Sequence, residues 1–149
     1  MDTSTVNNSG LPPGSNTMPL RVLLADDSQD VRRLVATLLG TNPAGWSVCG
    51  DAADGVDALK KVAELRPDVV MLDLSIPKLS GVEVAKRLGA EHSSCAIILM
   101  SAHDPAMLER MAEAARIPYS VSKANLAGTL TAVLESILDK KRGEVSAAR

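Results

Sequence analysis

Carboxylates, a hydroxyl and an amine each follow a short apolar run at separate points along the chain. These residues are Asp26 and Asp27, Asp73, Ser101 and Lys123. The run before Asp73, residues 69–72, is typical of a strand buried on both faces, and Pro77 and Gly81 indicate a loop after it. In an open parallel α/β sheet, ligands bind beyond the carboxyl ends of the strands. The spacing therefore predicts a site at one edge of such a sheet.

The types of these side chains indicate which chemistry the site could support. Carboxylates brought together repel one another and cannot all stay ionised without a nearby cation. Mg²⁺ suits such a site, because proteins commonly hold it with one or two carboxylates plus water and phosphate oxygens. Lys123 and Ser101 would add a positive charge and a hydroxyl donor for a tetrahedral anion. A carboxylate left free for nucleophilic attack would then carry an aspartyl phosphate.

Five apolar runs are predicted as strands that alternate with helices. The strands are expected at residues 21–25, 46–50, 69–72, 96–100 and 119–121. The helices are expected between Ser28 and Gly40, at 54–66, at 81–90, at 104–115 and at 125–141. Either Asp27 or Ser28 can cap the first helix, while Asp54 and Asp104 can cap the second and the fourth.

The alternation of strands and helices predicts an α/β fold. Right-handed crossovers place helices on both faces of a parallel sheet, so we expect a doubly wound, five-stranded, flavodoxin-like sheet. Its predicted strand order is 2-1-3-4-5. In this order the first and third strands are neighbours, which brings Asp26 and Asp27 beside Asp73.

Composition predicts one domain with a core of aliphatic side chains. The hydrophobic fraction is 46%, with one Trp, one Tyr and no Phe. A net charge of −2 without a basic stripe argues against nucleic acid as a direct partner. No run approaches the roughly 18 apolar residues of a membrane span, and no signal peptide is recognisable, so we expect a cytoplasmic protein. Residues 1–19 are expected to be a disordered tail, 20–141 the domain and 142–149 a short C-terminal tail.

The polar residues predicted at the strand ends match a known family: residues 20–141 resemble the receiver (CheY-like) domain of two-component response regulators. The resemblance implies that Asp73 is the phosphoacceptor. It implies that Mg²⁺ is held by Asp26, Asp27, Asp73 and the backbone carbonyl of Ser75, and that Ser101 and Lys123 bind the phosphoryl group. The implied donor is a phosphohistidine on a histidine kinase or a histidine phosphotransfer protein.

The sequence departs from the pattern of that family near the predicted site. Ala124 replaces the proline that usually follows the lysine, so the peptide bond there is expected to be trans. Ser120 stands where an aromatic residue is usual, and Tyr119 is expected on the opposite face of its strand. Signalling is therefore expected without an aromatic rotamer switch. His103 lies where the family's residues border the site and influence loss of the phosphoryl group, although a solvated loop histidine is an equal alternative.

The leading hypothesis is a stand-alone receiver that signals by protein contact, because only residues 142–149 follow the predicted domain. It would be no enzyme beyond its own phosphorylation and dephosphorylation, and a monomer or weak homodimer with an unidentified output protein. A degenerate receiver acting as a phosphorylation-independent interaction module is one alternative. The other is a Mg²⁺-dependent aspartyl phosphatase, although such enzymes generally need a second acid where this chain has Ser75.

Overall fold

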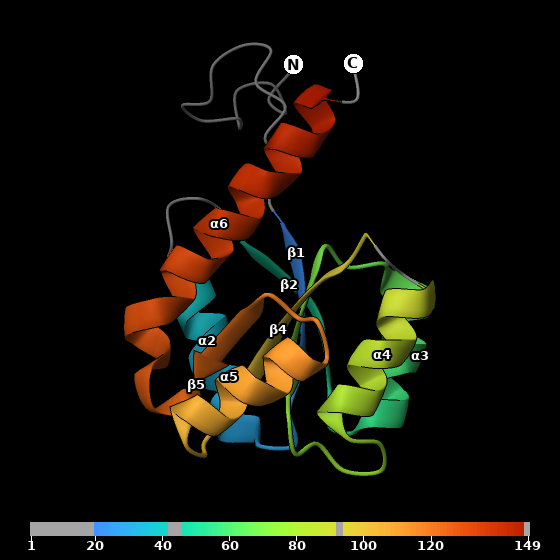
Figure 1. The fold of residues 1–149 in the computed structure, drawn as a ribbon, viewed down its shortest axis with the longest axis vertical. Coiled ribbons are helices and arrows are strands. Elements are labelled where there is room, and N and C mark those ends of the chain that lie inside the picture. The colour runs from blue at the N-terminus through green and yellow to red at the C-terminus, as the bar shows by residue number, and fades with distance from the viewer. Residues whose placement is uncertain (1–19, 42–45, 92–93, 148–149) are drawn as a thin grey trace, which may run out of the picture.

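The computed structural model describes residues 20–41, 46–91 and 94–147. The tail predicted at 1–19 therefore lies outside the described residues. Five parallel strands form one sheet in the order β2-β1-β3-β4-β5, with helices on both faces, which confirms the predicted topology (Figure 1). The strands are β1 (Arg21–Ala25), β2 (Ser47–Ala52), β3 (Val69–Asp73), β4 (Ala96–Ser101) and β5 (Tyr119–Ser122).

The helices alternate with the strands as the sequence predicts. The α-helices of the described chain are α2 (Gln29–Gly40), α3 (Gly55–Leu65), α4 (Gly81–Glu91), α5 (Pro105–Ala114) and α6 (Leu126–Ala147). A 3-10 turn, η1 (Lys123–Asn125), precedes α6. Among the described helices, none combines the length and the hydrophobicity that crossing a membrane would require.

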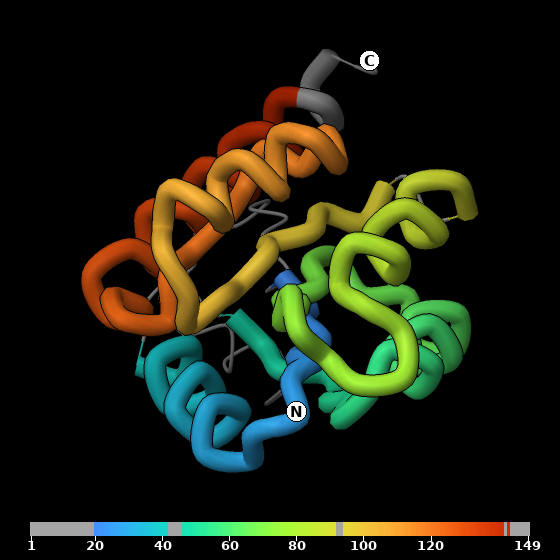
Figure 2. The backbone as a smooth tube through the Cα atoms, turned by 60° about the horizontal axis from the view of Figure 1, so that its bottom comes forward, coloured from blue at the N-terminus to red at the C-terminus, as the bar shows by residue number. Residues whose placement is uncertain are grey.

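Side chains that alternate along the strands divide the core into two layers. Leu23, Leu72 and Leu99 pack with α3, α4 and α5, whereas Val22 and Met71 pack with α2 and α6. Figure 2 shows α3 and α4 on the opposite side of the sheet from α2 and α6. β3 lies at the centre and is buried along its whole length, as expected of a strand covered on both faces.

Polar side chains begin the helices, as the sequence predicts. Ser28, rather than Asp27, caps α2, because its hydroxyl accepts a hydrogen bond from the Val31 N–H. Asp54 and Asp104 cap α3 and α5 in the same way. Ser28 therefore satisfies the helix end and leaves the Asp27 carboxylate available for other partners.

The last helix is longer than predicted. The sequence places its end at Lys141, but α6 continues to Ala147, so much of the segment expected as a C-terminal tail is helical. No proline occurs in this stretch, and the single glycine, Gly143, costs a helix only about 1 kcal/mol relative to alanine. That cost is too small to mark a helix end by itself.

Two loops at the carboxyl edge of the sheet are fastened together. The Gly55 N–H donates to the Pro77 carbonyl at 2.9 Å, and Lys78 Nζ lies 3.4 Å from Asp54 Oδ2. A Cβ at Gly55 would lie only 2.3 Å from the Leu79 carbonyl oxygen, so the close approach of the loops requires glycine. These contacts hold the β3–α4 loop, which begins directly after Asp73.

We predict that Gly55→Ala destabilises the protein by roughly 1–3 kcal/mol, because the new methyl group must displace a backbone carbonyl. Gly89→Ala is the matched control. Its Cβ would meet nothing within 4 Å, so the substitution should stabilise the protein by about 0.5–1 kcal/mol through helix propensity. Urea unfolding of the two variants and the wild type measures both effects, and equal shifts would contradict the steric argument.

Candidate functional site

The structure brings the polar strand ends together at one edge of the sheet. Asp26 and Asp27 follow β1 directly, and Asp73 is the last residue of β3. These strands are neighbours, with Ala25 paired to Leu72, so the three acids are adjacent. Ser101 ends β4, and Lys123 follows β5 at the same edge.

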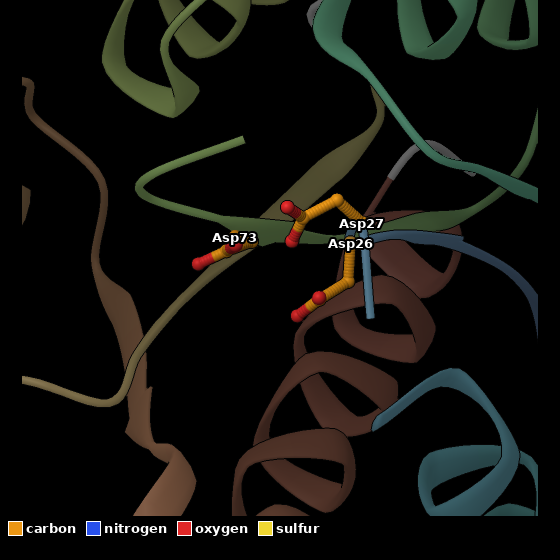
Figure 3. A group of neighbouring side chains, drawn as sticks. All are labelled: Asp26, Asp27 and Asp73. Carbon is orange, nitrogen blue, oxygen red and sulfur yellow. The ribbon is translucent and has the colours of Figure 1, made fainter. Parts of the chain in front are cut away.

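The three acids form a compact cluster. One carboxylate oxygen from each lies within 4.8 Å of the others, and Figure 3 shows the side chains projecting from the ends of two adjacent strands. Asp26 and Asp73 are buried, while Asp27 is exposed and gives the cluster an opening to solvent. Clustered carboxylate oxygens are the ligands that hard divalent cations prefer, so the donor set fits a metal such as Mg²⁺.

Lys123 balances the charge of the buried acids. Its ammonium lies 2.5 Å from Asp26 Oδ2 and 3.4 Å from Asp73 Oδ1. The other Asp26 oxygen, Oδ1, accepts a hydrogen bond from the Ser28 N–H at 2.8 Å, whereas Oδ2 has no partner apart from the ammonium. The sequence predicts Lys123 at this edge, but not its ion pair with Asp26.

The environment of Asp73 disfavours its ionised form. Burial raises the pKa of this carboxyl above the ordinary 3.8, and the nearby Asp26 raises it further. The Lys123 charge and a hydrogen bond from the Ser75 N–H, at 3.3 Å, lower the pKa without cancelling the effect of burial. Asp73 is therefore a partly desolvated carboxylate, which a cation would help to keep ionised.

Ser101 is almost fully buried, and its hydroxyl oxygen accepts a hydrogen bond from the His103 N–H at 3.0 Å. This contact fixes the oxygen at the start of the β4–α5 loop and leaves the hydroxyl hydrogen free to donate. The His103 side chain is exposed, which fits both a residue at the border of the site and a solvated loop histidine.

The residues on β5 lie as the sequence predicts. Tyr119 packs against the core layer of α2 and α6, whereas Ser120 pairs in register with Leu99, which belongs to the opposite layer. The described residues contain no cis peptide bond, so the bond after Lys123 is trans as expected. An aromatic ring therefore does not occupy the face of β5 on which Ser120 lies.

Sequence reasoning missed Arg32, whose Nη1 lies 2.5 Å from the Asp26 backbone carbonyl oxygen. Nothing in the sequence singles out Arg32, because charged residues of an amphipathic helix usually lie on its solvent-exposed face. The sequence offers one signal for such a contact, which is that Arg32 lies on the first turns of α2, shortly after Asp26 and the cap residue Ser28.

Comparison with known proteins identifies the family. Residues 22–135 match the response regulator receiver domain, and the chain belongs to that family. The receiver domain of AraT, a response regulator from Geobacillus stearothermophilus, superposes with a TM-score of 0.77 at 25% identity, covering 85% of this chain and 98% of that one. The response regulator domain of Thermotoga maritima CheB gives a TM-score of 0.65 at 28% identity, covering 85% and 96%.

Sequence relatives are longer proteins. A protein-glutamate methylesterase/protein-glutamine glutaminase of Koribacter versatilis is 42% identical over 58% of this chain and 23% of its own length. The response regulator MprA of Mycobacterium sp. (strain KMS) is 40% identical over 64% of this chain and 40% of its own length. The chain therefore spans less than half the length of these relatives.

We predict that Asp73→Asn stabilises the metal-free protein at neutral pH, by about 1 kcal/mol, because it removes a carboxylate that the fold disfavours in its charged form. A folded-state pKa above the unfolded value means that stability is lost as the pH rises through the folded pKa. The gain should therefore shrink as the pH falls through the folded-state pKa, which lies above 3.8, because wild-type Asp73 takes up its proton there.

The measurement is thermal unfolding in chelator across this pH range. Asp27→Ala should also stabilise at neutral pH by reducing repulsion within the cluster, whereas the exposed Asp139→Asn serves as a control with little effect. A loss of stability in both cluster variants would indicate that the acids serve only as structural caps.

We predict that Lys123→Met destabilises the metal-free protein by roughly 3 kcal/mol, because Asp26 would be left buried without a counter-charge. Lys78→Met is the matched control, since it breaks an ion pair whose lysine is 66% exposed and which is worth less than about 1 kcal/mol. Denaturant unfolding in chelator compares them. Equal effects would show that the Asp26 ion pair contributes no more than a surface contact.

Proposed function

We propose that the chain is a phosphorylated receiver in which Asp73 accepts a phosphoryl group from a phosphohistidine of a histidine kinase or phosphotransfer protein. The single observation that carries this proposal is the convergence of the three carboxylates with the Lys123 ammonium at the ends of β1, β3 and β5. The proposal assigns Mg²⁺ binding to Asp26, Asp27, Asp73 and the Ser75 backbone carbonyl. When bound, the ion would neutralise charge on the carboxylates and on the incoming phosphoryl oxygens.

Asp73 acts as the nucleophile in this proposal. One of its oxygens attacks phosphorus, an O–P bond forms, the N–P bond to the donor imidazole breaks, and the imidazole takes up a proton as it leaves. The Ser75 N–H and the Lys123 ammonium both contact Asp73 Oδ1, which fixes the orientation of the carboxylate. After transfer, Lys123 is close enough to pair with a phosphoryl oxygen on Asp73.

Ser101 provides a route by which the modified site can affect the surface. Its free hydroxyl hydrogen can donate to the new phosphoryl group, and its oxygen is already tied to the backbone of the β4–α5 loop at His103. Movement of Ser101 would therefore carry this loop with it. Ser120 is too small to fill the space that Ser101 leaves, so the change should reach α5 and β5 without rotation of an aromatic side chain.

Signalling by contact with another protein or segment is part of the proposal, because a receiver alone has no other output. A stand-alone cytoplasmic receiver and a receiver attached to further domains, as in the longer relatives, both accord with the site. The unphosphorylated interaction module and the aspartyl phosphatase remain alternatives. Against the phosphatase, the second position after Asp73 carries Ser75, which offers no carboxylate for acid or base catalysis.

We predict that wild-type protein incubated with a small phosphodonor and Mg²⁺ gains the mass of one phosphoryl group, whereas Asp73→Asn gains none. Intact-mass spectrometry measures this directly, because the single carboxylate nucleophile is replaced by an unreactive amide. Asp68→Asn, at the other end of β3, is the control and should be labelled like the wild type.

Labelling of Asp73→Asn to the wild-type extent would overturn the assignment of the phosphoacceptor. A wild type that stays unlabelled would favour the phosphorylation-independent module. Sustained turnover of a generic phosphate ester, measured as release of inorganic phosphate over many cycles, would instead favour the phosphatase.

A further inference from the structure

The Asp26 residue is held by contacts on every polar atom. Its N–H donates to the Ala52 carbonyl of β2 at 3.0 Å, and its carbonyl accepts from Arg32 Nη1 at 2.5 Å. Its side chain contacts the Ser28 N–H and the Lys123 ammonium. The Ala52 and Ser28 partners are backbone groups, and Lys123 binds the Asp26 carboxylate rather than its backbone. Arg32 is therefore the one side chain among these partners that binds the Asp26 backbone.

Arg32 is itself fixed between two strand ends. Its side chain is only 17% exposed, and Nε lies 3.3 Å from Asp51 Oδ2 on β2. This contact is an ion pair rather than an aligned hydrogen bond, because Nε has no hydrogen-bond partner. The Arg32 guanidinium therefore connects the Asp26 carbonyl, directly after β1, with the Asp51 carboxylate on β2. These two strands are neighbours in the sheet.

Arg32 binds the main chain next to the acidic cluster rather than the clustered carboxylates themselves. Among the described residues, Arg32 forms no ion pair with Asp26, Asp27 or Asp73 and binds only the main chain beside them. A positive charge at this place opposes the binding of a second cation by Coulomb repulsion. Its benefit must then come from geometry, since it leaves the carboxylates free while it fixes the backbone that carries two of them.

We propose that Arg32 is a positioning residue for the metal-binding acids: by bridging the Asp26 carbonyl to Asp51, it sets the backbone from which the Asp26 and Asp27 carboxylates project. This inference rests on the proposed function, because it assumes that the cluster binds a divalent cation. Asp51 belongs to the same device as the anchor that holds the guanidinium in place.

The proposal and simple electrostatics predict opposite signs. If Arg32 contributed only charge, Arg32→Met would tighten Mg²⁺ binding and Arg32→Lys would leave it unchanged. If Arg32 positions the acids, both substitutions weaken binding, since neither side chain can hold the carbonyl and the carboxylate together in the planar geometry of a guanidinium. Removing an outer partner of a metal ligand typically costs about 10-fold or more in affinity.

The experiment is calorimetric titration of the unphosphorylated protein with Mg²⁺ alone, with thermal unfolding as a separate check of folding. Arg32→Met should raise the Mg²⁺ dissociation constant about 10-fold, and Arg32→Lys should raise it by a smaller factor. Arg33→Met is the matched control, because it removes an equal charge from an exposed neighbour on α2. It should leave the dissociation constant unchanged or slightly lower.

Asp51→Ala tests the anchor, and it is informative even if Arg32→Met fails to fold, because Asp51 is 58% exposed. Asp51→Ala should weaken Mg²⁺ binding in the wild type but have little further effect in Arg32→Lys. Equal effects in both backgrounds would mean that Asp51 acts by its charge alone, which contradicts its assigned role.

Unchanged or tighter Mg²⁺ binding by both Arg32 variants would overturn the positioning role while leaving the proposed function intact. A wild type that binds no Mg²⁺ would overturn both. Weaker binding by both variants, with normal binding by Arg33→Met, would support the inference.

Discussion

The arrangement of the strand ends in this domain depends on the ion pair between Asp26 and Lys123. Asp26 is fully buried at the carboxyl edge of the sheet, and its Oδ2 lies 2.5 Å from the ammonium. A buried carboxylate without a counter-charge would cost several kcal/mol, so the chain must leave β1 and β5 at the same edge of the sheet. The strand order places β3 and β4 between them, and those strands end in the remaining polar residues of the site, Asp73 and Ser101.

The loops at this edge are short and held by specific contacts. Gly55 allows the β2–α3 loop to touch the β3–α4 loop, and Lys78 adopts a left-handed backbone with φ of 71° while it pairs with Asp54. A left-handed backbone is unfavourable for a residue with a side chain, so the surrounding contacts must offset that cost. The result is a fixed path for the segment that follows Asp73.

The acidic cluster is built so that a cation resolves an existing conflict. Burial raises the pKa of Asp73. A single ammonium, that of Lys123, lies close to the carboxylates of both Asp73 and Asp26. A divalent ion at the exposed Asp27 side would relieve the same repulsion and free Lys123 for a phosphoryl group. In the proposed function, protein stability, metal affinity and phosphoryl transfer would thus all depend on the charges of Asp26, Asp27, Asp73 and Lys123.

The sequence alone predicts the strand order, the gathering of Asp26, Asp27, Asp73, Ser101 and Lys123 at one edge of the sheet, and the opposite orientations of Tyr119 and Ser120. Apolar runs that stop at polar residues, and side chains that alternate with period two, are local patterns that a sequence shows directly. The three-dimensional contacts are needed to show that Lys123 pairs with Asp26, that Arg32 binds the Asp26 carbonyl, and that glycine is required at position 55 beside Leu79. These contacts join segments whose separation depends on loop paths and on the length of side chains across neighbouring strands. No periodic pattern encodes such distances, so the sequence does not show which side chain contacts which partner.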